Sequence, residues 1–148
     1  MWVDFPEPKA PRSRDIAECS CCGNDCMNGC DLKLMDIECD KRFHGGRDCG
    51  NQRLQRRQYA KTAVRQAGLK GNGLFAAQRI KKHQLISEYV GEVISEKTVL
   101  ERLNQKHFYA LKLKANYYID ASKYGNETRF INHSCDSNAE ARFVYIGD

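Results

Sequence analysis

The stretch RFINHSCDSN, residues 129–138, is the part of the sequence that decides the fold. A polar run such as NHSC is by itself a common turn, so its meaning depends on what precedes it. Four segments precede it in a fixed order, namely KGNGLFA (70–76), ISEYVGEVIS (86–95), FYALKL (108–113) and YIDASKYGNET (118–128). A chance turn does not account for the whole ordered series.

The surrounding chain predicts a mainly β fold with a small α component. Short pieces rich in β-branched and aromatic residues, broken by glycine, predict strands. These pieces are TAVRQAG (62–68), GLFAAQRI (73–80), QLISEYVGEVIS (84–95), FYALKL (108–113), NYYIDA (116–121) and EARFVYIG (140–147). One helix is expected over 96–106, with Ser95 as its N-cap and an apolar face made of Val99, Leu100 and Leu103.

Composition predicts a globular chain inside the cell. The 148 residues are 41% hydrophobic, which suffices for a core, and the formal net charge of +5 favours acidic partners without demanding them. No apolar run approaches the roughly 20 residues that cross a bilayer, and residues 1–15 lack the apolar core of a secretory signal. We therefore expect no membrane association and reduced cysteines.

Seven of the eight cysteines fall between Cys19 and Cys49, an odd cluster that cannot pair off internally. Residues 18–50 have few long apolar side chains, so zinc bound by thiolates is expected to supply stability. Pairs separated by one to four residues let one turn of chain present two thiolates to one ion. Two separate sites would use all seven cysteines and His44, whereas two sites that share a thiolate would leave one cysteine spare.

This cysteine arrangement resembles the AWS module of histone H3 lysine-36 methyltransferases, in which two zinc sites share a cysteine. The resemblance assigns Cys19, Cys21, Cys26 and Cys30 to the first site and Cys26, Cys39, His44 and Cys49 to the second. His44 stands where that family usually has cysteine, and the alternative for it is a surface imidazole in a glycine-rich loop.

The ordered series ending in residues 129–138 resembles the SET domain, whose hallmark RFxNHSCxPN is present with Ser137 in place of the proline. The resemblance covers residues 18–148 and implies short-strand β-sheets with a pseudoknot. It divides the chain into an extended lead-in (1–17), a zinc-stabilised AWS module (18–58) and a SET domain (59–148). It also implies transfer of a methyl group from S-adenosylmethionine to a lysine of histone H3, with lysine 36 expected.

Site residues follow from the same resemblance. The expected S-adenosylmethionine-binding residues are Lys70, Gly71, Asn72, His107, Phe108, Tyr109, Asn132 and His133. Tyr109 is the expected catalytic residue, because a tyrosine hydroxyl can orient an amine without competing as a nucleophile. His133 is alternatively a histidine satisfied within the core. Cys135 is expected to bind a third zinc only together with the cysteine-rich tail that the family carries downstream.

The family pattern also continues into further strands and a second active-site tyrosine, and the sequence ends at Asp148 before them. We therefore expect an enzyme fragment that is inactive alone, located in the nucleus on chromosomes, with the histone H3 tail in nucleosomes as its partner. DNA phosphates are expected to contact Arg53, Arg56 and Arg57, although a solvated charged face is an equal alternative. A non-catalytic chromatin module is the rival interpretation. A zinc-dependent nucleic-acid reader is disfavoured, because the cysteine spacings offer no C₂H₂ recognition helix.

Overall fold

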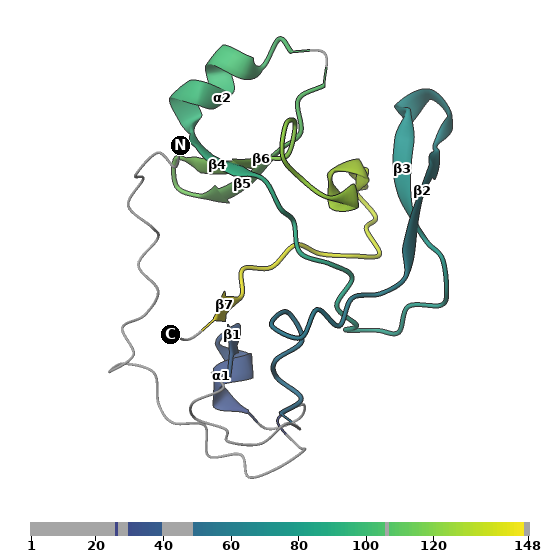
Figure 1. The fold of residues 1–148 in the computed structure, drawn as a ribbon, viewed down its shortest axis with the longest axis vertical. Helices are drawn as coiled ribbons and strands as arrows, with labels where there is room; N and C mark the ends of the chain where they lie inside the picture. Colours follow the sequence, from purple (N-terminus) through teal and green to yellow (C-terminus); the bar gives the residue numbers. More distant parts are fainter. Residues whose placement is uncertain (1–25, 27–29, 40–48, 106, 147–148) are drawn as a thin grey trace. The chain divides into compact units, whose positions relative to one another are not determined.

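The computed structural model describes residues 26, 30–39, 49–105 and 107–146 (Figure 1). The chain forms two compact units by internal contacts. The first, which we call the cysteine unit, consists of residues 1–57 together with 141–148, and the second consists of residues 58–140. No helix in the described residues is both long and apolar enough to span a bilayer.

The described part of the cysteine unit is small and is built around sulfur. Helix α1 (Asp31–Leu34) leads into strand β1 (Ile37–Glu38), which pairs in parallel with β7 (Tyr145–Ile146) near the opposite end of the chain. Its buried cluster consists of Cys26, Cys30, Leu32, Ile37, Cys39 and Cys49, with Tyr145 packed against it. With only two long apolar side chains in that cluster, the cysteines supply most of the core.

In the second unit, strands β2 (Thr62–Gln66) and β3 (Asn72–Ala76) form an antiparallel hairpin (Figure 1). The short 3₁₀ helix η1 (Gly68–Lys70) closes it. The chain takes positive φ values at Gly68 (60°) and Gly71 (75°), which glycine adopts without the cost that a Cβ imposes. The two glycines therefore fit the turn that the hairpin requires.

A three-stranded antiparallel sheet forms the rest of this unit, in the order β4 (Glu92–Ser95), β6 (Tyr117–Asp120) and β5 (Ala110–Lys114). Gly91 precedes β4 at a point of close approach, since a Cβ there would lie 2.5 Å from the Asp120 carbonyl oxygen. The mainly β architecture predicted from the sequence is confirmed, and these strands position the residues that carry the candidate chemistry.

Helix α2 (Glu96–Arg102) begins as predicted. The Ser95 Oγ accepts a hydrogen bond from the Thr98 N–H at 3.3 Å, which makes Ser95 the N-cap. The predicted apolar face was wrong in part, because Val99 is buried but Leu100 and Leu103 are 63% and 54% exposed. The helix also ends at Arg102, before the predicted residue 106.

The predicted strand over 84–95 is present only as β4, and the carbonyls of Leu85, Ile86 and Glu88 bond to single groups instead of a neighbouring strand. The Leu85 and Ile86 carbonyls both accept from the Ala60 N–H, at 3.1 and 3.0 Å. The Glu88 carbonyl accepts from the side chains of Asn126 and Thr128, at 2.8 and 3.3 Å. Asn126 is also the N-cap of the 3₁₀ helix η2 (Glu127–Phe130). The segment 84–91 is therefore connected to η2 by side-chain hydrogen bonds and not by strand pairing.

Candidate functional site

The glycine hairpin and the NHSC segment meet in the structure, although they lie far apart in the sequence. The Asn132 amide nitrogen donates to the Asn72 carbonyl oxygen at 3.5 Å, a long hydrogen bond. A Cβ at Gly73 would lie 3.1 Å from the same amide nitrogen and 3.0 Å from the Ala67 Cβ. Gly73 therefore gives Asn132 the room to reach the main chain of β3.

The turn before β3 is held by its own main chain. The Gly71 N–H donates to the Gly68 carbonyl at 3.2 Å, and the Gly71 carbonyl accepts from the Ala67 N–H at 2.6 Å. Lys70 and Gly71 are exposed, and a Cβ at Gly71 would meet nothing within 4 Å. An open, rigid piece of main chain is thus presented beside Asn132, which retains amide oxygen lone pairs for a polar ligand.

Tyr109 is fixed at its main chain and at its ring. Its N–H donates to the Ser122 Oγ at 2.9 Å, and its carbonyl accepts from the Ala121 N–H at 2.7 Å. Its ring makes an edge-to-face contact with Phe130, with centroids 5.8 Å apart. The predicted catalytic tyrosine is therefore joined to the segment that follows β6 and to the start of the NHSC region.

The remaining predicted residues are less connected. His107 and Phe108 lie just before β5, and no described contact joins them to the other candidates. His133 is exposed, so the alternative of a core histidine is wrong. Its Nε2 lies 3.6 Å from the sulfur of Cys135, which is also exposed.

Tyr89 is a further candidate site residue, which sequence reasoning missed. Its hydroxyl donates to the Tyr109 carbonyl at 3.3 Å. Burial raises the pKa of the Tyr89 phenol, and the negative charge of Asp120 adds to this effect. The phenol therefore stays protonated and remains a donor at neutral pH. The available signal was an aromatic side chain directly before the glycine-containing stretch VGEVIS.

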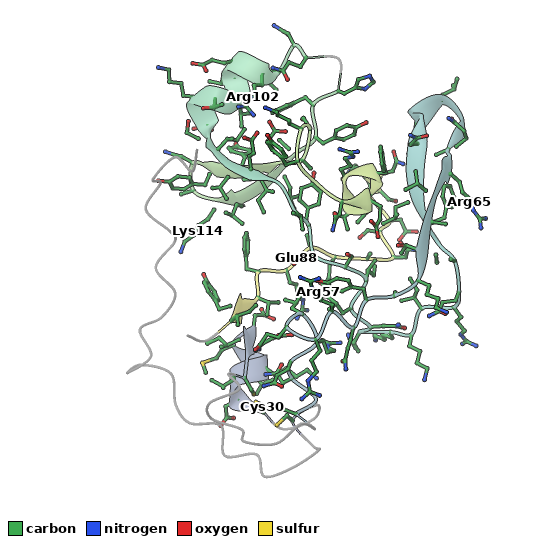
Figure 2. All side chains as sticks on the ribbon, viewed as in Figure 1. Cys30, Arg57, Arg65, Glu88, Arg102 and Lys114 are labelled. Atoms are coloured by element: carbon green, nitrogen blue, oxygen red, sulfur yellow. The ribbon has the colours of Figure 1, made fainter. Side chains whose placement is uncertain are left out.

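Asp120, at the end of β6, is the second residue that was missed. It is 0% exposed, and its Oδ2 lies 2.7 Å from the Arg102 Nη1 of α2 (Figure 2 labels Arg102). Burial opposes ionisation, but hydrogen bonds from Ser122 and Arg102 outweigh it and lower the pKa of this carboxyl below its ordinary value. Asp120 is therefore a buried carboxylate, and its signal was an acidic residue closing an otherwise apolar strand.

The cysteine unit brings together the thiols of a candidate metal centre. The sulfurs of Cys26, Cys39 and Cys49 all lie within 4.8 Å of one another, and all three residues are buried. The Cys30 sulfur lies 3.6 Å from that of Cys39. Two thiolates on one tetrahedral zinc lie about 3.8 Å apart, since each Zn–S bond is about 2.3 Å. This donor set fits zinc, while the predicted ligands Cys19, Cys21 and His44 lie outside the described residues.

Asn51, in the junction after Cys49, donates hydrogen bonds into this cluster. Its amide nitrogen lies 3.3 Å from the Cys39 sulfur, 3.8 Å from the Cys30 sulfur and 2.9 Å from the Ile37 carbonyl oxygen. Burial raises the pKa of the Cys39 thiol, and the Asn51 hydrogen bond acts in the opposite direction. A bound cation would favour the thiolate in the same way as Asn51 does.

Comparison with known proteins finds a family model and curated relatives that match this chain. The model of the SET domain family matches residues 71–148. Curated proteins named "Histone-lysine N-methyltransferase, H3 lysine-36 specific" are similar, with 42% identity in Candida albicans (86% of this chain, 16% of that protein) and 45% in Emericella nidulans (86% and 13%). The chain thus spans less than a fifth of these relatives.

Solved structures of polycomb repressive complex 2 contain chains similar to this one. An active polycomb repressive complex 2 in the basal state has a TM-score of 0.77 at 28% identity, covering 87% of this chain and 21% of that chain. A humanized mutant of the Chaetomium thermophilum complex, bound to an inhibitor, has a TM-score of 0.75 at 27% identity, covering 86% and 20%.

Proposed function

Since this chain belongs to the SET domain family, we propose that it is part of a histone-lysine N-methyltransferase that transfers a methyl group from S-adenosylmethionine to lysine 36 of histone H3. The observation that carries the proposal is the contact of Asn132 with the main chain of Asn72, because it joins the two motifs expected to hold the cofactor. The names of the curated relatives support the substrate and the lysine position.

S-Adenosylmethionine supplies a methyl group on a sulfonium, and the protein's task is to bind it and align the acceptor. The Asn132 amide can both donate to the carboxylate and accept from the ammonium of an amino-acid head group. The main chain at Lys70, Gly71 and Asn72, open to solvent beside it, completes this part of the proposed pocket. His107, Phe108 and His133 are proposed to contribute further contacts.

Methyl transfer to an amine is an in-line displacement, so rate depends on holding a neutral lysine in line with the methyl group. We assign the orienting role to Tyr109, whose ring packs on Phe130 and whose main chain is bonded on both sides. Tyr89 donates to the Tyr109 carbonyl, and burial keeps its phenol protonated. Tyr89 therefore adds a neutral polar group beside the Tyr109 main chain.

Zinc is proposed to stabilise the cysteine unit. Two ions would be held by Cys19, Cys21, Cys26, Cys30, Cys39, His44 and Cys49, with Cys26 shared between them. The grouping of the Cys26, Cys39 and Cys49 sulfurs supports the second site. A third ion at Cys135 is proposed only with a cysteine-rich segment supplied from elsewhere in the protein.

The partners are proposed to be the histone H3 tail and nucleosomal DNA, which place the protein in the nucleus on chromosomes. Arg53, Arg56 and Arg57 would contact phosphates. The junction that carries them is held in shape, since Glu38 accepts from the N–H groups of Leu54 and Gln55 at 2.6 and 3.1 Å. Arginines carried on such a segment can neutralise phosphates and release their counterions.

The test is calorimetry with S-adenosylmethionine on the wild-type protein, on Asn132→Ala and on the exposed matched control Asn104→Ala. We expect at least about a tenfold loss of affinity in Asn132→Ala, since its head-group hydrogen bonds are lost, with unchanged zinc content and no loss in Asn104→Ala. Mass spectrometry of treated nucleosomes would then locate the methyl group. Unchanged cofactor affinity in Asn132→Ala, or an active protein that modifies another histone residue, would contradict the proposal.

A further inference from the structure

We propose that Arg102, Asp120 and Ser122 form a positioning path that connects helix α2 to the main chain of Tyr109. The inference rests on the proposed function, because it assigns a role to residues around the tyrosine proposed to orient the lysine. None of the three was expected from the sequence to belong to the site. They act through Tyr109 and are therefore positioning residues.

The first step of the path joins α2 to β6. The Arg102 Nη1 lies 2.7 Å from the Asp120 Oδ2 and 3.2 Å from the Glu92 Oε2. The Asp120 side chain is almost fully buried, whereas Arg102 and Glu92 are partly exposed. A buried carboxylate with a charged partner has little freedom to move, since a displacement would leave its charge unpaired. The Asp120 carboxylate is thus a fixed point at the end of β6.

The second step joins Asp120 to Tyr109 through Ser122. The other oxygen of Asp120, Oδ1, accepts from the Ser122 N–H at 2.8 Å. The Ser122 Oγ in turn accepts from the Tyr109 N–H at 2.9 Å. Both main-chain polar groups of Tyr109 are therefore bonded to the two residues after Asp120, because its carbonyl accepts from the Ala121 N–H at 2.7 Å.

This arrangement bears on catalysis because a small displacement of a positioning group is costly. A shift of about 1 Å in a catalyst that works by alignment can lower the rate about a hundredfold. The Tyr109 main chain lies directly before β5 and is held by the hydrogen bonds just described. Loss of the Ser122 hydroxyl removes one of them and leaves the Ser122 N–H bond to Asp120 in place.

The experiment compares Ser122→Ala and Ser122→Thr with Gln84→Ala, each made in the full-length methyltransferase of which this chain is proposed to be part. Gln84 is the matched control, because its side-chain oxygen also accepts from a main-chain N–H, that of Lys81 at 2.9 Å, but it lies in a turn outside the path. In Ser122→Ala we expect kcat for nucleosome methylation to fall about tenfold, with KM for S-adenosylmethionine unchanged within about twofold. Ser122→Thr retains the hydroxyl and should recover most of kcat. Gln84→Ala should leave kcat close to wild type.

A second readout separates this inference from the proposed function. Hydrogen exchange of the Tyr109 amide should accelerate in Ser122→Ala and stay slow in Ser122→Thr, whether or not the protein is active. Faster exchange with an unchanged kcat would overturn the positioning role and leave the methyltransferase assignment standing. A full-length wild-type protein that neither binds the cofactor nor methylates nucleosomes would overturn both.

Arg102 provides a second pair of variants if Ser122→Ala fails to fold. Arg102→Met keeps the aliphatic stem and removes the charge, whereas Arg102→Lys keeps a donor for Asp120. The path predicts a fall in kcat for the methionine variant and partial recovery for the lysine variant, again at constant KM for the cofactor. Equal activity of the two variants, or a change confined to KM, would overturn it.

Discussion

At the scale of single residues, Asn51 contacts several groups of the cysteine cluster through a single side-chain amide. One amide nitrogen lies within hydrogen-bonding range of two buried thiols and of the Ile37 carbonyl. A donor aimed at a thiolate withdraws charge from it and fixes its orientation, which is how groups outside the metal's own ligands tune a zinc site. Its position two residues after Cys49 places it on the same turn as a candidate ligand.

We predict that Asn51→Ala weakens zinc binding about 10- to 100-fold, because the thiolates lose an oriented donor. Competition against a chelator of known affinity would measure the change. Asn126→Ala is the matched control, since Asn126 also donates to a main-chain carbonyl but belongs to the other unit. Zinc affinity that is equal in the two variants would contradict this role of Asn51.

Sequence reasoning identified candidate residues that lie in recognisable motifs, but it did not identify Asp120 and Ser122, which support such residues through hydrogen bonds. Asn132 and the glycine hairpin could be predicted to meet, because the order of the motifs resembles a known family. Asp120 and Ser122 could not, because their partners depend on the pairing of β6 with β4 and β5 and on where α2 ends. A carboxylate at a strand end looks the same in a sequence whether it is solvated or buried.

At the scale of elements, α2 is held to the three-stranded sheet by the ion pair of Arg102 with Asp120. The pKa of Asp120 is lower in the folded protein than its ordinary value of 3.8. A carboxyl of this kind adds to the free energy of unfolding while it is ionised in both states. The contribution is present above about pH 4 and is lost as the pH falls through the folded pKa.

We therefore predict that Asp120→Asn lowers the free energy of unfolding at pH 7 by about 2 kcal/mol, since charged hydrogen bonds are lost. The difference from wild type should shrink as the pH is lowered from 5 to 3. Urea unfolding at several pH values would measure it. Glu92→Gln, which removes the more exposed partner of Arg102, should cost less than about 1 kcal/mol. A difference for Asp120→Asn that does not depend on pH would contradict the assignment of an ionised carboxylate.

Element boundaries were predictable where local chemistry decides them. Ser95 begins α2 because a serine hydroxyl can satisfy a free main-chain N–H, and this holds in any tertiary context. The segment 84–91 has a strand-like composition but forms no ladder, because its carbonyls bond to Ala60 and to the side chains around η2. These partners lie far away in the sequence, and the local pattern of apolar and polar residues in 84–91 contains no information about them.

At the scale of the whole molecule, the two units differ in what holds them together. Among the described residues, the buried cluster of the cysteine unit contains four thiols and only two long apolar side chains, whereas the other unit has three antiparallel strand pairings in two sheets. So little apolar core in the described part of the unit is the physical reason to expect that bound metal stabilises it.

We predict that a strong zinc chelator abolishes amide protection in the described part of the cysteine unit while β4, β5 and β6 stay protected. Hydrogen exchange with mass spectrometry would show this, with elemental analysis to confirm metal loss and zinc addition as the control for reversibility. Protection should be lost at Tyr145 and Ile146 together with β1, because these strands pair. A cysteine unit that stays protected without metal would contradict the prediction.

The parallel pairing of β1 with β7 also affects when the chain can complete its folding during synthesis. Ile37 is synthesised early, but its partner Tyr145 follows only after the whole of residues 58–140. Long-range pairing of this kind waits for closure of the intervening chain. Until β7 has been synthesised, β1 lacks its partner strand. Metal bound by the cysteines around Ile37 could hold β1 in its conformation during that time. The zinc concentration during synthesis would then affect what fraction of nascent chains forms the pairing of β1 with β7.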